Sequence, residues 1–129
     1  MQVMQSGVPF PRRRARREIT LSFDFDSAEI SGPGSLKIAE IIEVYGQGLP
    51  VTIVVSGHAD HAGPATYNET LSQRRAETVR KKLIEAGVPV QLITASFHGE
   101  RRPLIETENG VREPLNRRVK ITLDHAKSL

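Results

Sequence analysis

The sequence contains no cysteine and no long hydrophobic run. Without cysteine there can be no disulfide framework, no thiolate zinc site, no thiol nucleophile and no cysteine to carry a lipid anchor. No stretch approaches the roughly 18 apolar residues that a membrane-spanning helix requires. Residues 1–10 also lack the basic-then-apolar order of a secretory signal peptide. These absences predict that the 129 residues do not cross a bilayer, and that the chain is either a fragment or cytosolic.

Motifs for common catalytic sites are also missing. The sequence has no Gly-x-Ser-x-Gly elbow, no Walker-type phosphate loop and no carboxylate pair with glycosidase spacing. His58, Asp60 and His61 share one segment, with His98 and His125 elsewhere, which raises a metal-dependent hydrolase as an alternative. Their spacing lacks the helical His pair and third ligand typical of catalytic zinc. We therefore expect a binding protein without catalytic residues, bound metal or cofactor.

Basic residues are concentrated at the start of the chain. Five of the 18 lysines and arginines lie between Arg12 and Arg17, and the sequence after residue 17 holds 13 basic and 15 acidic residues, a net charge of −2. No aromatic residue is interleaved with these arginines to stack on bases, so nucleic acid is not an expected partner. Residues 1–17 are predicted to be a flexible, solvated segment, with contact to an anionic surface as the alternative.

The remaining sequence alternates between strand-like and helix-like patterns, which predicts a single α+β domain over residues 18–124 and a tail over 125–129. Apolar residues alternate in the first and last strands, whereas the 51–55 run is almost continuously apolar and is expected to be covered on both faces. The predicted architecture is a two-layer sandwich, β-α-β-α-β-β, with the helices packed on one mixed sheet. The expected strands are 18–25, 51–55, 90–97 and 119–123, and the expected helices are 34–46 and 67–86.

Arg75 is the most informative polar residue, because it lies in the apolar stripe of the second helix. It follows Leu71 by four residues and precedes Val79 by four, whereas the helical neighbours of Arg74 are polar. A guanidinium at the edge of a core needs a partner, since an unpaired buried charge costs several kcal/mol. Asp60, in the segment that leads into this helix, is the expected anion.

Two interpretations of Asp60 and Arg75 remain open. They could form an ion pair that tethers the loop to the helix, or they could bind the ammonium and carboxylate of a free amino-acid group. Backbone N–H groups at the start of the helix could add donors for the carboxylate. Asn68, one helical period before Arg75, could contact the same ligand or only cap the helix.

Several motifs together resemble the OmpA-like C-terminal domain family, over roughly residues 18–123. Phe23-Asp24-Phe25-Asp26-Ser27 is similar to the opening strand of that family. The other matching segments are Gly57-His58-Ala59-Asp60, Tyr67-Asn68, Leu71-Ser72, Arg75-Ala76, Val79, Gly99-Glu100, Pro103 and Asn116-Arg117-Arg118-Val119.

The resemblance implies non-covalent binding of peptidoglycan in the periplasm, with diaminopimelate of the peptide stem as the recognised group. It implies a ligand-ammonium carboxylate at Asp60, a ligand-carboxylate arginine at Arg75, and a pocket wall at Asn68 and Leu71. Arg118 is carried over as a residue that borders the pocket, although alternation along the last strand leaves Arg117 open. The resemblance further implies attachment to the outer membrane or cell envelope through sequence upstream of this chain.

The sequence departs from the family pattern at Ala59, where Thr is frequent, at His98, where Tyr is frequent, and at Pro64, which interrupts the loop before the second helix. The loss of a hydroxyl at position 59 is expected to affect affinity more than ligand identity. A module that binds another envelope protein, through the first helix or the Arg12–Arg17 tract, is a further alternative.

Overall fold

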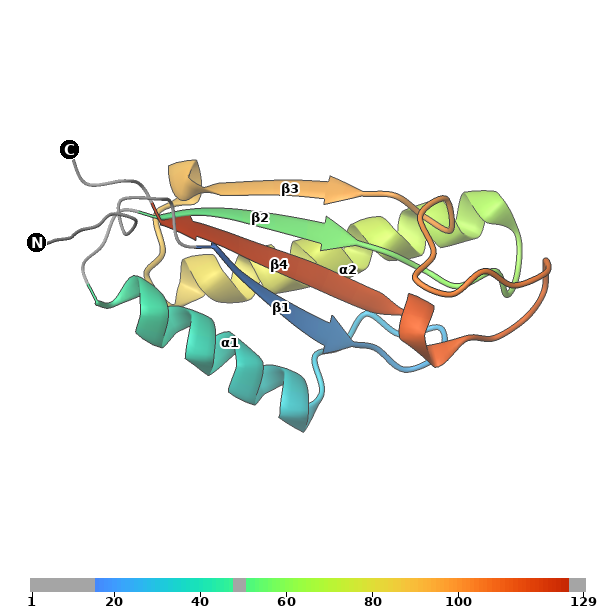
Figure 1. The fold of residues 1–129 in the computed structure, drawn as a ribbon, viewed down its shortest axis with the longest axis horizontal. Coiled ribbons are helices and arrows are strands. Elements are labelled where there is room, and N and C mark those ends of the chain that lie inside the picture. Colours follow the sequence, from blue (N-terminus) through green and yellow to red (C-terminus); the bar gives the residue numbers. More distant parts are fainter. Residues whose placement is uncertain (1–15, 48–50, 126–129) are drawn as a thin grey trace, which may run out of the picture.

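The computed structural model describes residues 16–47 and 51–125, which form four strands and two long helices (Figure 1). Single 3-10 turns precede β3 and β4. The elements in chain order are β1 (Arg16–Ser22), α1 (Gly32–Tyr45), β2 (Val51–Gly57), α2 (Ala65–Glu85), β3 (Ile93–Phe97) and β4 (Arg118–His125).

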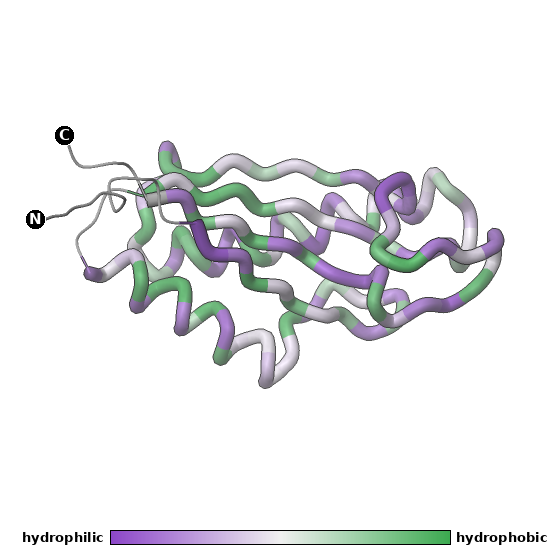
Figure 2. Tube along the Cα trace, viewed as in Figure 1, coloured by the Kyte–Doolittle hydropathy of each residue, from purple (hydrophilic) through white to green (hydrophobic). Residues whose placement is uncertain are grey.

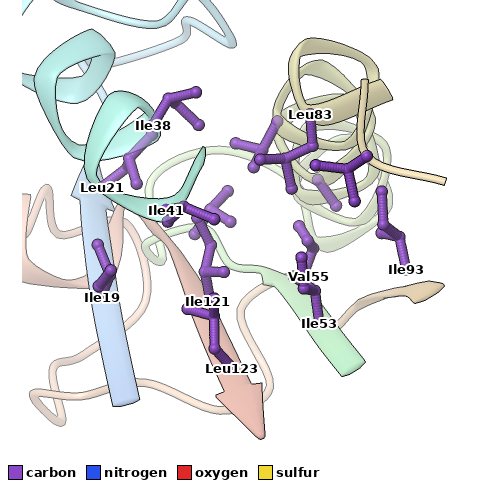
Figure 3. Packing of buried hydrophobic residues seen from close by; sticks show 14 of the residues in the cluster. Ile19, Leu21, Ile38, Ile41, Ile53, Val55, Leu83, Ile93, Ile121 and Leu123 are labelled. Atoms are coloured by element: carbon purple, nitrogen blue, oxygen red, sulfur yellow. The ribbon is translucent and has the colours of Figure 1, made fainter. Parts of the chain in front are cut away.

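The four strands form one mixed sheet in the order β1-β4-β2-β3. β4 is antiparallel to both β1 and β2, whereas β2 and β3 are parallel and are connected through α2. Both helices pack on the same face of this sheet (Figure 3). The predicted α+β sandwich and its strand–helix order are confirmed.

The core lies between the helices and the sheet (Figure 3). Alternate residues of β2, among them Ile53 and Val55, point into it, but Thr52 is exposed and Val54 is half-buried. The expectation that this strand is covered on both faces is therefore wrong. The helices cover one face only, and β-branched residues on the other face produce an apolar run without a second layer.

Element boundaries differ from prediction where local geometry ends a pattern. β1 stops at Ser22, and the chain then turns so that Asp26 takes a left-handed conformation (φ 54°) and Phe25 is exposed. α2 begins at Ala65, directly after Pro64, because proline cannot donate a backbone hydrogen bond but is tolerated at a helix start. β3 begins only at Ile93, because Val90–Leu92 forms a 3-10 turn.

Most of the polar loops lie at one end of the sheet. β1, β2 and β3 end there and β4 begins there, so the segments that follow or precede these strands meet (Figure 1). Hydrophilic residues are frequent in these loops, whereas hydrophobic residues are frequent along the strands (Figure 2). Residues 1–15 of the predicted basic segment and 126–129 of the predicted tail lie outside the described residues. Among residues 16–47 and 51–125, no helix is both long and apolar enough to cross a membrane.

Candidate functional site

A cavity of about 190 Å³ opens among the loops at this end of the sheet. The segment after β1, the β2–α2 loop and the first turns of α2 enclose it. Four of the five residues predicted for the site, Asp60, Asn68, Leu71 and Arg75, lie in its wall. The full lining comprises Phe25, Asp26, Asp60, Ala62, Gly63, Pro64, Tyr67, Asn68, Leu71 and Arg75.

Arg75 is fully buried (0% exposed) on the core-facing stripe of α2, as its spacing predicts. Its guanidinium donates to three backbone carbonyls, from Nε to Ser27 (2.8 Å), from Nη1 to His58 (2.9 Å) and from Nη2 to Asp24 (3.1 Å). The predicted Asp60–Arg75 ion pair is absent from the described residues. Carbonyl oxygens from two loops satisfy the buried cation instead, which the spacing of charged residues could not reveal.

The environment of Arg75 leaves it charged at neutral pH. Burial lowers the pKa of Arg75 to about 10, and the nearby Asp60 carboxylate opposes this shift. The guanidinium also lies over the Phe23 ring, 5.4 Å from its centroid. A guanidinium has five N–H donors, so the three carbonyl bonds leave two N–H groups without an acceptor among the described residues.

Asp60 is held by partners on both of its carboxylate oxygens, and only 4% of the residue is exposed. Oδ1 accepts from the Ala62 backbone N–H (3.2 Å). Oδ2 accepts from the Glu113 N–H (3.0 Å) and from Arg117 Nη1 (3.2 Å). These contacts fix the carboxylate at the cavity wall before any ligand is present.

Arg117, not Arg118, is the arginine of the Asn-Arg-Arg segment that contacts the candidate site. Arg117 also donates from Nε to the Phe23 carbonyl (3.1 Å). Neither arginine lines the cavity itself, and Arg117 reaches it only through Asp60. Arg118 is the first residue of β4, and its Nη2 donates to the Arg102 carbonyl (3.2 Å). Since Val119 points into the core, alternation directs Arg118 to the opposite face of the sheet. The expected position of Arg118 beside the pocket is therefore corrected.

Asn68 does not cap α2, which is the other interpretation of this residue. The residue at the cap position is Pro64, and no side chain caps this helix end. Asn68 Nδ2 instead donates to Glu100 Oε1 (2.9 Å) and to the Gly63 carbonyl (3.4 Å). Asn68 thereby connects α2 to the loops that follow β2 and β3.

The rim of the cavity contains aromatic residues whose roles sequence reasoning did not assign. Tyr67 donates a hydrogen bond to Asp26, and this contact raises the pKa of the Tyr67 hydroxyl. The guanidinium of Arg112, from the β3–β4 loop, lies 3.7 Å from the centroid of the Phe25 ring. Phe25 and Asp26 belong to the Phe23-Asp24-Phe25-Asp26-Ser27 motif, which resembles the opening strand of the OmpA-like family. This resemblance is the sequence signal that could have identified them as site residues.

The histidines in these loops have other contacts. The rings of His58 and His98 stack with their centroids 5.1 Å apart, and His61 Nδ1 lies 3.0 Å from Glu100 Oε2. Within residues 16–47 and 51–125, no cluster of three acidic, histidine or cysteine residues could hold a metal ion. The geometry therefore gives no support to the hydrolase alternative.

Comparison with known proteins agrees with this fold. The OmpA family model matches residues 22–117. An outer membrane porin F of Pseudomonas fluorescens is 33% identical over 109 residues, covering 84% of this chain and 33% of the relative. A peptidoglycan-associated lipoprotein of Mesorhizobium japonicum is 33% identical over 106 residues, covering 82% of this chain and 63% of the relative.

Solved structures show the same fold. The crystal structure of the peptidoglycan-associated lipoprotein from Burkholderia pseudomallei superimposes with a TM-score of 0.68 at 27% identity, covering 81% of this chain and 88% of the other. The chain spans only about a third of the length of the porin relatives it matches. The match over residues 22–117 includes every element that encloses the cavity. The chain belongs to the OmpA family.

Proposed function

We propose that this domain binds peptidoglycan non-covalently through the diaminopimelate of its peptide stem, and so anchors the protein, or a membrane to which it belongs, to the cell wall. The observation that carries the proposal is a single cavity walled by a buried carboxylate, Asp60, and a buried guanidinium, Arg75. The lipoprotein relatives are named as peptidoglycan-associated, and these names support peptidoglycan as the ligand.

The free end of diaminopimelate carries an ammonium and a carboxylate on one carbon. Asp60 would accept from the ammonium, and the two remaining N–H groups of Arg75 would donate to the carboxylate. The side chains of Leu71 and Phe25 offer apolar contact to the methylene chain between the two amino-acid centres. A lysine at the same place in the stem has the ammonium without the carboxylate, so it would leave Arg75 without its ligand partner.

The proposed role is binding without turnover. The cavity wall contains carboxylates, an amide, a guanidinium and the Tyr67 hydroxyl, and these groups can bind a zwitterionic ligand by charge and hydrogen bonds alone. A location in the periplasm, attached to the outer membrane or envelope, fits the names of the porin and lipoprotein relatives.

The test is sedimentation of the domain with insoluble peptidoglycan that contains either diaminopimelate or lysine in its stems. We expect binding to the diaminopimelate wall only. Asp60→Asn should lower affinity at least about tenfold, because a charge-assisted hydrogen bond to the ammonium is lost. Asp124→Asn, the same change near the other end of the sheet, is the control and should bind like the parent.

Amide chemical shifts during titration with meso-diaminopimelate would locate the site. Shifts centred on Asp60, Asn68 and Arg75 are expected. Equal binding to both walls, or shifts confined to another surface, would refute the assignment.

A further inference from the structure

The amide of Asn68 is held from two sides by groups that only accept hydrogen bonds. Glu100 Oε1 lies 2.9 Å from Nδ2, and the Gly63 carbonyl lies 3.4 Å from the same nitrogen. Both a carboxylate and a carbonyl need a donor, so the chemistry of these neighbours requires the NH₂ group on their side. If the amide were reversed, Asn68 Oδ1 would face the acceptor oxygens of Glu100 and Gly63, and no hydrogen bond could form between them.

This arrangement leaves Oδ1 of Asn68 for the cavity. Asn68 is part of the cavity wall, and its Oδ1 has no hydrogen-bond partner among the described residues. An amide oxygen is an acceptor with two lone pairs. The cavity wall therefore presents an acceptor in addition to the carboxylates of Asp60 and Asp26, and all three favour a ligand group that donates.

Glu100 is itself fixed, although it does not line the cavity. Its second oxygen, Oε2, lies 3.0 Å from His61 Nδ1, and 18% of its side chain is exposed. The preceding residue, Gly99, has a left-handed conformation (φ 57°) and donates its N–H to Ser72 Oγ (2.8 Å) on α2. Loop and helix together hold the carboxylate where it can orient Asn68.

We propose that Glu100 is a positioning residue that sets the ligand preference of the cavity: by binding the NH₂ of Asn68, it presents Oδ1 to the ligand ammonium beside Asp60. Without this restraint the amide could turn and present its NH₂ group, which would repel an ammonium. The inference rests on the proposed function and assigns to Glu100 a role that acts entirely through Asn68.

The test compares two small ligands, meso-diaminopimelate and pimelate, which has both carboxylates and no ammonium. Glu100→Gln keeps the size of the side chain but adds an NH₂ group that can bind Asn68 Oδ1. We expect it to lower affinity for diaminopimelate about tenfold, the order of one hydrogen bond to a charged group, and to leave affinity for pimelate unchanged. Glu106→Gln, the same charge change at an exposed position of the same loop, should behave like the parent.

A double-mutant cycle separates positioning from a general structural effect. Asn68→Ala should also reduce the preference for diaminopimelate over pimelate, and Glu100→Gln should then have no further effect. If Asn68→Ala keeps the full preference of the parent, the inference is overturned, even if Glu100→Gln fails to fold. Failure of the parent to bind diaminopimelate would overturn the proposed function as well, whereas parent-like preference in Glu100→Gln would overturn only the role of Glu100.

Discussion

Adjacent arginines on α2 have opposite environments. Arg74 is exposed, whereas Arg75 is buried and joins the segment after β1 to the residue after β2 through three carbonyl bonds. The helical period of 3.6 residues rotates neighbours by about 100°, which is enough to put one in the core and the other in solvent. Arg75 therefore has a structural role in addition to its proposed contact with the ligand.

Arg75→Lys is expected to lower the free energy of unfolding by about 2–4 kcal/mol, because one ammonium cannot reach three carbonyls that lie in different directions. Chemical denaturation of parent and variant measures the loss. Arg74→Lys is the matched control and should change stability by less than about 0.5 kcal/mol. Equal losses in the two variants would contradict the structural role of Arg75.

This structural role also decides how binding should be tested. A loss of wall binding in Arg75→Ala cannot by itself identify the ligand contact, because the loops that form the cavity depend on the same side chain. Arg75→Ala is therefore expected to disturb these loops, whereas Asp60→Asn keeps the shape of the side chain. Variants of Asp60 and Asn68 therefore test ligand binding more directly than variants of Arg75.

At the scale of elements, a glycine allows β2 and α2 to pack in close contact. A Cβ atom at Gly57, the last residue of β2, would lie 2.0 Å from the backbone oxygen of Ser72 and 3.2 Å from the Cβ of Ala76. Neither the helix backbone nor the strand can move without opening the core. The position of α2, and with it Asn68 and Arg75, depends on this contact.

Gly57→Ala is expected to destabilise the domain by about 3 kcal/mol, at the upper end for overpacking, because the clash is with backbone. It should also weaken ligand binding, since α2 carries four of the ten residues that line the cavity. Gly32→Ala, at the start of α1, is the control: its Cβ would have nothing within 4 Å. We expect the control to change stability by no more than about 1 kcal/mol, because the added Cβ meets only the adjacent Pro33. A Gly57→Ala protein as stable as the parent would refute the packing argument.

At the scale of the whole molecule, His58 links stability to pH. Burial lowers the pKa of His58 to about 3, assisted by the charges of Arg118, His98, Arg102 and Lys120. Only the unfolded chain then binds a proton at this residue between about pH 6.5 and pH 3. The contribution of neutral His58 to stability is complete above pH 6.5 and decreases as the pH falls through this window.

His58→Gln removes this titration. We expect the unfolding free energy of the parent to decrease toward acid pH more steeply than that of the variant, by up to about 1.4 kcal/mol per pH unit. Burial also lowers the pKa of His98, and this residue is present in both proteins, so its titration contributes to both slopes. Denaturation at several values between pH 7 and pH 4 measures both slopes, and parallel slopes would contradict the prediction.

Much of this architecture could be predicted from the sequence. The alternation of Ile19, Leu21 and Phe23 and the stripe of Leu71, Arg75 and Val79 depend only on backbone periodicity, and the structure confirms both. Boundaries were less predictable, as at Phe25, where an apolar residue continues the strand pattern although the chain has already left the sheet.

The sequence by itself determined which side chains of β1, β4 and α2 face the core, because periods of two and 3.6 residues are local properties of the chain. It also determined that a buried arginine on α2 needed partners. Only the tertiary structure decided that these partners are carbonyls of Asp24, Ser27 and His58, that Arg117 pairs with Asp60, and that Asn68 donates to Glu100. Such contacts join residues far apart in the chain, and backbone carbonyls, which every residue has, leave no mark in the sequence.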